Sequence, residues 1–182
     1  MFLKNFSPNL SSKHINNLKN HKYHAEGKSL VEPYFQIFWN ASINIVPKSI
    51  HPNLLTFLGF IFNIIFAIIF LFVNSSLEND ISKYVLLFGV FCIFMYQTLD
   101  AIDGKQARRI NLCSSLGEIM DHGCDSISMV ILTVVVIGTI GLGDNPIMTL
   151  FLFLMLNINF YTAHWQCFVS GKIIFGNQIS QD

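Results

Sequence analysis

Charged residues are scarce in this 182-residue chain: Lys, Arg, Asp and Glu make up 12% of it and cancel to a net charge of zero. Proteins that bind nucleic acid usually carry a basic excess, so this balance argues against such a partner. Soluble domains typically contain about 25% charged residues. Here 52% of the residues are hydrophobic and the mean hydropathy is +0.51. The composition therefore predicts an integral membrane protein.

Paired cysteines and a signal peptide are also missing. The four cysteines are scattered without any C-x-x-C spacing, and three lie in apolar stretches, which favours buried thiols over a disulfide framework. The first thirty residues hold five lysines but no apolar core of the kind that a secretory signal peptide has. The length suits one domain. These absences argue against a disulfide framework and against an N-terminal secretory signal.

Long apolar runs are abundant. A helix needs roughly 20 apolar residues to cross a hydrocarbon layer of about 30 Å. Four stretches are long enough, and we expect membrane-spanning helices at 52–73, 84–103, 116–140 and 146–165. The stretch before them has polar interruptions, so an amphipathic helix on the membrane surface is predicted at 33–48. The expected fold is an all-α integral membrane protein, with a cytosolic segment over 1–32 and the membrane domain over 49–182.

The positively charged residues predict the orientation of the spans. Threading four spans through a bilayer puts ten of the eleven lysines and arginines on one side, and only Lys83 on the other. The same side receives both termini and the 104–115 connection between the second and third spans. The positive-inside rule therefore predicts that both termini and this connection are cytosolic.

A polar pattern interrupts the apolar sequence. It reads D-x2-D-G-x2-A-R-x8-G-x3-D-x3-D, and its positions are Asp100, Asp103, Gly104, Ala107, Arg108, Gly117, Asp121 and Asp125. Ionisable residues are costly in membrane segments and usually mark a functional site there. Residues three or four apart share a helix face, so the aspartates form two pairs on facing helices. Two such pairs predict a site for divalent cations near the cytosolic ends of the spans.

The ligand type indicates which cations suit the site. Carboxylates are hard oxygen donors that favour Mg²⁺, Mn²⁺ or Ca²⁺ over zinc. Zinc binding through His122 and Cys124 is disfavoured, because both point away from the Asp121/Asp125 face and no second Cys/His pair accompanies them. Two carboxylate pairs suit a two-metal site for displacement at phosphorus, and Mg²⁺ is usually completed by substrate phosphate oxygens.

Small and cationic residues among the aspartates suit a phosphate-containing substrate. Gly104 and Gly117 let a ligand approach the backbone, and the small side chain of Ala107 leaves room on the same helix face. Arg108 can bind phosphate through two hydrogen bonds. Taken singly, each residue has a simpler explanation: glycines pack membrane helices and an arginine anchors at the interface. In one fixed register, the set favours a phosphate-binding site.

The eight-position pattern resembles the signature of the CDP-alcohol phosphotransferase family, with every specified position present. The stretches "HKYHAEGKSLVEP", "PNLLTFLG", "DAIDGKQARR", "LGEIMDHGCDS", "FYTAHWQ" and "VSGKIIFG" are similar to those of its eukaryotic choline/ethanolamine phosphotransferases. The resemblance implies transfer of phosphocholine or phosphoethanolamine from CDP-choline or CDP-ethanolamine to diacylglycerol. The products would be phosphatidylcholine or phosphatidylethanolamine and CMP, made in the endoplasmic reticulum or Golgi.

The resemblance also implies roles for particular residues. It implies a two-metal site of Mg²⁺ or Mn²⁺ whose ligands are Asp100, Asp103, Asp121 and Asp125. Asp125 is in addition the candidate catalytic base. The residues implied to bind the substrate are Asn53, Gly104, Ala107, Arg108 and Gly117. The lipid bilayer is a further expected partner, and the sequence leaves a homo-oligomer open.

Length is where the sequence departs from this family. The family core has six membrane helices and four are predicted here, so we expect a C-terminally shortened chain. An inactive membrane protein that associates with full-length family members therefore stays open as an alternative. A third hypothesis uses CDP-diacylglycerol as the donor, with inositol, serine or glycerol phosphate as the acceptor. The longer match around "DHGCDS" argues against it.

Overall fold

The structure is a computed structural model that describes residues 11–12, 25–27, 31–77, 81–171 and 173–175. Five helices follow one another along the described chain: α2 (Glu32–Ile45), α3 (Pro52–Val73), α4 (Lys83–Arg109), α5 (Ser115–Thr139) and α6 (Pro146–Ser170). Two short strands, β1 (Ala25–Gly27) and β2 (Ile173–Phe175), pair in parallel. Most of the predicted cytosolic segment 1–32 lies outside the described residues.

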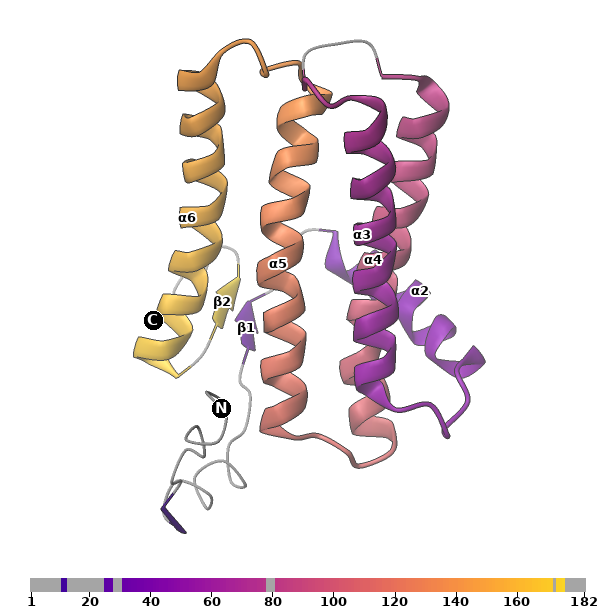
Figure 1. Cartoon of the computed structure of the whole chain (residues 1–182). Coiled ribbons are helices and arrows are strands. Elements are labelled where there is room, and N and C mark those ends of the chain that lie inside the picture. The colour runs from indigo at the N-terminus through magenta and orange to yellow at the C-terminus, as the bar shows by residue number, and fades with distance from the viewer. Residues whose placement is uncertain (1–10, 13–24, 28–30, 78–80, 172, 176–182) are drawn as a thin grey trace, which may run out of the picture.

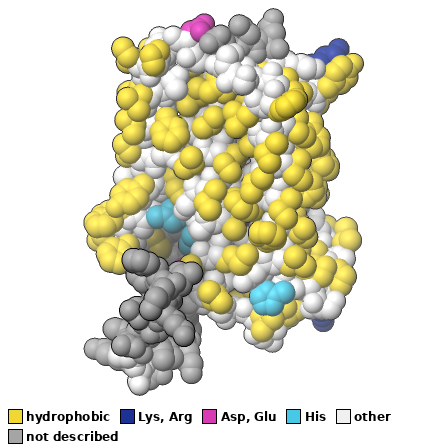
Figure 2. Space-filling view, viewed as in Figure 1, with side chains coloured by type: hydrophobic (Ala, Val, Ile, Leu, Met, Phe, Trp, Pro, Cys, Tyr) yellow, Lys and Arg dark blue, Asp and Glu magenta, His cyan; other side chains and the backbone are white. Residues whose placement is uncertain are grey.

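The predicted all-α membrane class is confirmed, with the small β1–β2 pair as an addition that hydropathy did not predict. Helices α3 to α6 are each long and apolar enough to cross a membrane. They run side by side in alternating directions (Figure 1). In the space-filling view, hydrophobic side chains cover the middle of the visible face, while the coloured charged side chains lie at its two ends (Figure 2). This distribution suits a bundle surrounded by lipid.

The helix boundaries test the predicted spans. α3 covers the predicted 52–73, because Pro52 suits a first helical turn and the His51 ring caps it by accepting the Asn53 N–H. The prediction for α4 was wrong at its end: the helix continues past 103 to Arg109, so 104–109 is helical and the connection to α5 is only 110–114. α5 differs from prediction by one residue at each end. α6 runs five residues beyond 165.

Helix α3 is the centre of the bundle. It packs against both α4 and α5, and α6 packs against α5, whereas no comparable backbone packing joins α4 directly to α5 among the described residues. The main apolar core lies where the three central helices meet, and its buried members are Phe66, Ala67, Phe70, Cys92 and Val135. Because α3 holds α4 and α5 from one side, side chains from α4 and α5 can meet across the space between them.

Helix α2 lies against the last turns of α4 (Figure 1). The predicted helix at 33–48 is confirmed as α2, with ends one and three residues away. Its buried Ile43 packs in a second apolar cluster with Leu55 of α3 and Ile102 of α4. Another set of apolar side chains on α2 is exposed, including Ile37 and Ile45. Its place at a membrane surface stays a prediction.

Candidate metal and nucleotide site

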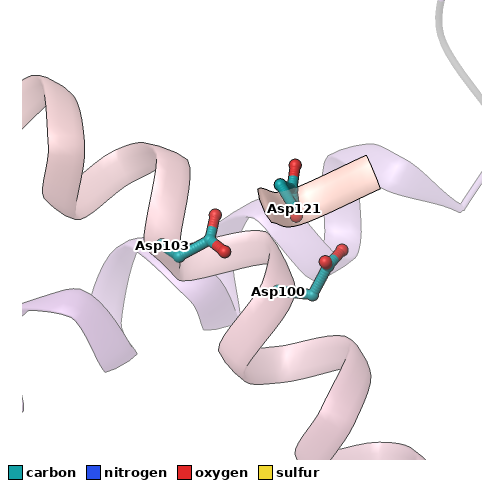
Figure 3. A group of neighbouring side chains, drawn as sticks. All are labelled: Asp100, Asp103 and Asp121. Carbon is teal, nitrogen blue, oxygen red and sulfur yellow. The ribbon is translucent and has the colours of Figure 1, made fainter. Parts of the chain in front are cut away.

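Three of the four predicted metal ligands come together between α4 and α5. Asp100 and Asp103 lie one turn apart on α4, and Asp121 lies in the second turn of α5. Each offers a carboxylate oxygen within 4.8 Å of the others. Figure 3 shows the three side chains around a common space. The spacing argument therefore predicted a real convergence of these residues in three dimensions.

The electrostatics of this cluster favour a bound cation. Asp103 is buried, and Asp100 and Asp121 are half-buried. The Oδ1 atoms of Asp100 and Asp121 are buried without a hydrogen-bond partner. Carboxylate oxygens in this state are costly, since they repel one another and have lost their contacts with water. A divalent cation among them would remove both costs, so the residues present fit a metal ion.

Asp103 has a partner that the sequence did not predict. The hydroxyl of buried Thr56, in the first turns of α3, donates a hydrogen bond to Asp103 Oδ2. Hydrogen bonds to ionised carboxylates are stronger than neutral ones and fix the direction of the acceptor. Thr56 therefore orients Asp103 toward the cluster. The two residues are 47 positions apart, so neither helical spacing nor hydropathy signals the contact.

Asp125 is not one of the three residues whose carboxylate oxygens lie within 4.8 Å of one another. It follows Asp121 by one turn of α5, and its Oδ1 accepts a hydrogen bond of 2.5 Å from the hydroxyl of Tyr96 on α4. Asp125 is still close enough to Asp100 for their charges to repel. Tyr96 is a second site neighbour that the sequence did not predict, since the pair joins two helices. The roles of Asp125 as fourth ligand and base stay predictions.

A cavity of about 470 Å³ opens beside the aspartates. It is lined by all five predicted substrate-binding residues, which are Asn53, Gly104, Ala107, Arg108 and Gly117. Asp103 and Asp121 also line it, whereas Asp100 and Asp125 do not. The metal cluster and the predicted nucleotide site therefore share a wall. A ligand in the cavity would reach two of the three clustered carboxylates.

Two helix N-termini meet at this cavity. Asn53 is at the start of α3 and Gly117 at the start of α5, and a Cβ on Gly117 would lie 3.5 Å from Asn53 Oδ1. Ser114 Oγ caps α5 by accepting the Gly117 N–H at 3.1 Å. The positive ends of helix dipoles favour anions. Arg108 lies beside Gly104, where a Cβ would be 3.4 Å from Nη1, and adds a full positive charge. The cavity therefore suits a phosphate group.

Two further polar residues line the cavity, Glu118 and His122. They lie one turn apart on α5, with His122 Nε2 at 4.0 Å from Glu118 Oε1. The His122 ring meets His164 of α6 edge-on, with ring centroids 5.1 Å apart. Glu118 and His122 directly follow the signature positions Gly117 and Asp121, and neither is among the site residues assigned from the sequence. This contact brings α6 to the edge of the site.

These features define a helical membrane protein with a carboxylate cluster beside a cavity whose lining suits an anion. The family model described as CDP-alcohol phosphatidyltransferase matches residues 49–176. This chain belongs to that family, which confirms the family predicted from the signature.

Relatives of known name extend this finding. "Cholinephosphotransferase 1" of Danio rerio is 40% identical over 167 residues, covering 92% of this chain and 44% of the relative. The protein of the same name from Rattus norvegicus is also 40% identical, covering 92% of this chain and 42% of the relative. The one from Homo sapiens is 38% identical over 175 residues, covering 96% and 43%. The chain thus spans less than half the length of these relatives.

Proposed function

We propose that this chain transfers phosphocholine or phosphoethanolamine from CDP-choline or CDP-ethanolamine to diacylglycerol. The products are phosphatidylcholine or phosphatidylethanolamine and CMP. The carboxylate cluster beside a cavity lined by the remaining signature residues is the observation that supports this function best. The relatives named cholinephosphotransferase favour choline as the alcohol.

The signature residues divide between metal and donor. Asp100, Asp103 and Asp121 hold Mg²⁺ or Mn²⁺, and Asp125 completes a two-metal site. When bound, these ions neutralise the charge of the pyrophosphate and of the departing nucleotide. Arg108 and the N-terminus of α5 bind the phosphates from the other side of the cavity. Asn53, Gly104, Ala107 and Gly117 leave room for the nucleotide.

Asp125 is the proposed base. The acceptor hydroxyl oxygen bonds to the phosphorus that carries the alcohol, the bond from that phosphorus to the CMP oxygen breaks, and the hydroxyl proton must leave. Oδ1 of Asp125 already accepts the Tyr96 hydroxyl. Oδ2 is therefore the atom that takes this proton. In this role Tyr96 keeps the carboxylate turned in one direction.

The proposed orientation puts the cavity on the cytosolic side of the endoplasmic reticulum or Golgi membrane. Lys105, Arg108 and Arg109 lie in the last turns of α4, at the end of the bundle where the cavity opens. Positive charge concentrates on the cytosolic side of membrane proteins. A water-soluble nucleotide then enters from the cytosol, while a lipid hydroxyl arrives from the bilayer.

A transfer assay tests this function. We expect the chain, expressed in membranes that lack other transferases of this kind, to release CMP from CDP-choline or CDP-ethanolamine when diacylglycerol and Mg²⁺ or Mn²⁺ are supplied. A chelator should stop the release, and added metal should restore it, because the carboxylate cluster needs a cation to bind pyrophosphate. CMP release is measured for each donor separately. Absence of both CMP release and CDP-alcohol binding would contradict the proposal for this chain.

A hydroxyl deletion tests the orientation of Asp103. Thr56→Val keeps the shape of the side chain and removes its donor to Asp103. A hydrogen bond to a charged group contributes about 1.5–3 kcal/mol, so we expect the metal concentration for half-maximal transfer to rise roughly tenfold or more. Titrating Mn²⁺ in the CMP-release assay measures the shift. Thr139→Val is the matched control, since Thr139 bonds only within α5 at the far end of the bundle. Equal metal requirements in both variants would remove Thr56 from the site.

A further inference from the structure

The last turns of α4 present two different faces. Asp103, Gly104, Ala107 and Arg108 line the cavity. The neighbouring Lys105, Gln106 and Arg109 instead contact α2 and the segment 46–51 that connects α2 to α3. Positions about 100° apart on a helix alternate between faces in this way. The signature therefore contains a second set of polar residues, to which the proposed chemistry assigns no role.

Gln106 holds the connecting segment directly. Its Nε2 donates to two backbone carbonyls, Pro47 O at 3.0 Å and Ile50 O at 2.9 Å. Gln106 is fully buried. Arg109 Nη1 donates to Ile43 O at 2.7 Å and Val46 O at 2.9 Å. The last carbonyls of a helix lack partners within it. Side chains of α4 therefore satisfy the end of α2 and the turn that follows.

Lys105 extends the same contact to α2. Its Nζ donates to Gln36 Oε1 at 2.6 Å and to Asn40 Oδ1 at 2.8 Å, one turn apart on α2. An apolar cluster beneath these bonds joins Ile43 to Ile102 of α4. Three side chains of α4 therefore attach α2 and the connecting segment to α4: Lys105, Gln106 and Arg109.

The position of this segment matters because it leads into the cavity wall. The segment ends at His51, and Pro52, Asn53 and Thr56 follow at once as cavity-lining residues of α3. Thr56 in turn donates to Asp103. α4 is therefore hydrogen-bonded to the first turns of α3 through Thr56, and to the segment that precedes α3 through Gln106. A shift of the outer joint would move Asn53 relative to Gly117.

Apolar packing alone does not explain a glutamine at this position. Gln106 Oε1 is buried without a hydrogen-bond partner, whereas Nε2 donates to two backbone carbonyls that a methionine would leave without this donor. What glutamine adds is a pair of directed bonds to two carbonyls of a non-helical turn. Such bonds determine where the turn lies more narrowly than apolar contact does. This is the pattern of a residue kept for geometry.

We propose that Gln106, supported by Arg109, is a positioning residue for the donor nucleotide: it fixes segment 46–51 and thereby the α3 end that carries Asn53 and Thr56. The inference rests on the proposed function, because the nucleotide in the cavity is that of the CDP-alcohol. It assigns Gln106 no contact with substrate or metal. Its effect on donor binding passes through the backbone carbonyls of Pro47 and Ile50.

The test compares Gln106→Met with Gln97→Met in the full chain in membranes. Gln97 is exposed on the same helix, so the control makes the same chemical change away from the segment. We expect Gln106→Met to raise the KM for CDP-choline at least fivefold with kcat within twofold of wild type, and Gln97→Met to change neither. Hydrogen exchange of the amides at 48–51 should become faster in Gln106→Met only.

The possible outcomes distinguish a failure of this inference from a failure of the proposed function. Equal KM values for both variants, in a wild type that transfers normally, would overturn the positioning role and leave the function intact. Faster exchange at 48–51 without a change in KM would overturn it too, because the bonds would then serve the fold alone. A wild type that neither binds nor uses CDP-alcohols would overturn both. Should Gln106→Met fail to insert, Arg109→Met loosens the same segment from an exposed position, and an unchanged KM there counts against the proposal.

Discussion

Replacing Asp103 by asparagine should reduce phospho-alcohol transfer by about a hundredfold or more, the usual cost of removing a group that stabilises charge at a reacting centre. The amide keeps the size of the side chain and can still accept the Thr56 hydroxyl. It removes one negative charge from three carboxylates within 4.8 Å of one another. The expected loss is therefore in metal binding and catalysis, with membrane insertion unchanged. CMP release per folded protein measures it.

The same substitution should make the apo protein more stable. Removing one of three mutually repelling carboxylates relieves the folded state, so Asp103→Asn should melt above wild type in detergent with a chelator present. Added Mn²⁺ should stabilise wild type and leave the variant almost unchanged, because a ligand stabilises only the state that binds it. Asp144→Asn is the control, since Asp144 is exposed in the turn before α6. Normal transfer and a normal Mn²⁺ response in Asp103→Asn would exclude the carboxylate cluster as the metal site.

Asp125→Asn should also abolish transfer, but with a different thermal signature. Asp125 is bonded to Tyr96 and is not one of the three carboxylates that lie within 4.8 Å of one another. We therefore expect Mn²⁺ to keep stabilising this variant through the remaining three aspartates, in contrast to Asp103→Asn. Loss of the Mn²⁺ response in Asp125→Asn would instead make Asp125 an essential ligand of the first ion bound.

Hydropathy predicted the helices where the lipid and the protein core both require apolar side chains. α3 has the highest hydropathy of the four candidate spans among the described residues, and Pro52 and Asn74 mark its ends. The end of α4 was missed because residues 104–109 are polar on every side, which in isolation indicates a connection. They remain helical because one side faces the cavity and the other holds α2 through Gln106 and Arg109. Polarity there marks the candidate site, and the helix continues through it.

The site was predictable only along each helix. Spacing placed Asp100 with Asp103 and Asp121 with Asp125, because a helical period relates positions three and four apart. The partners that orient these carboxylates, Thr56 and Tyr96, come from other helices and leave no periodic signal. The same limit applies to the contact between Asp125 and Tyr96, which depends on the packing of α4 and α5 against α3.

That packing makes its own strong prediction at Gly89 of α4. A Cβ there would lie 2.2 Å from Cζ of Phe66, a distance that real Cβ atoms do not reach. Phe66 is 2% exposed and packs edge-on against Phe70, so its ring has little room to move. Gly89→Ala should therefore separate α3 from α4 and destabilise the bundle by about 1–3 kcal/mol, the usual cost of overpacking a core. Thermal melting in detergent measures the change.

Gly123→Ala is the matched control for this effect. Both glycines lie inside helices, so alanine gains about 1 kcal/mol of helix propensity at either position. Nothing lies within 4 Å of a Cβ on Gly123, and that variant should melt at or above the wild-type temperature. Shortening the buried ring in the double variant Gly89→Ala/Phe66→Leu should recover part of the loss, because the two sites are in contact and their effects cannot simply add. If Gly89→Ala instead melts at the same temperature as Gly123→Ala, α4 does not pack on Phe66. The convergence of Asp100 and Asp103 with Asp121 depends on how α3 packs against α4, so it would lose its structural basis.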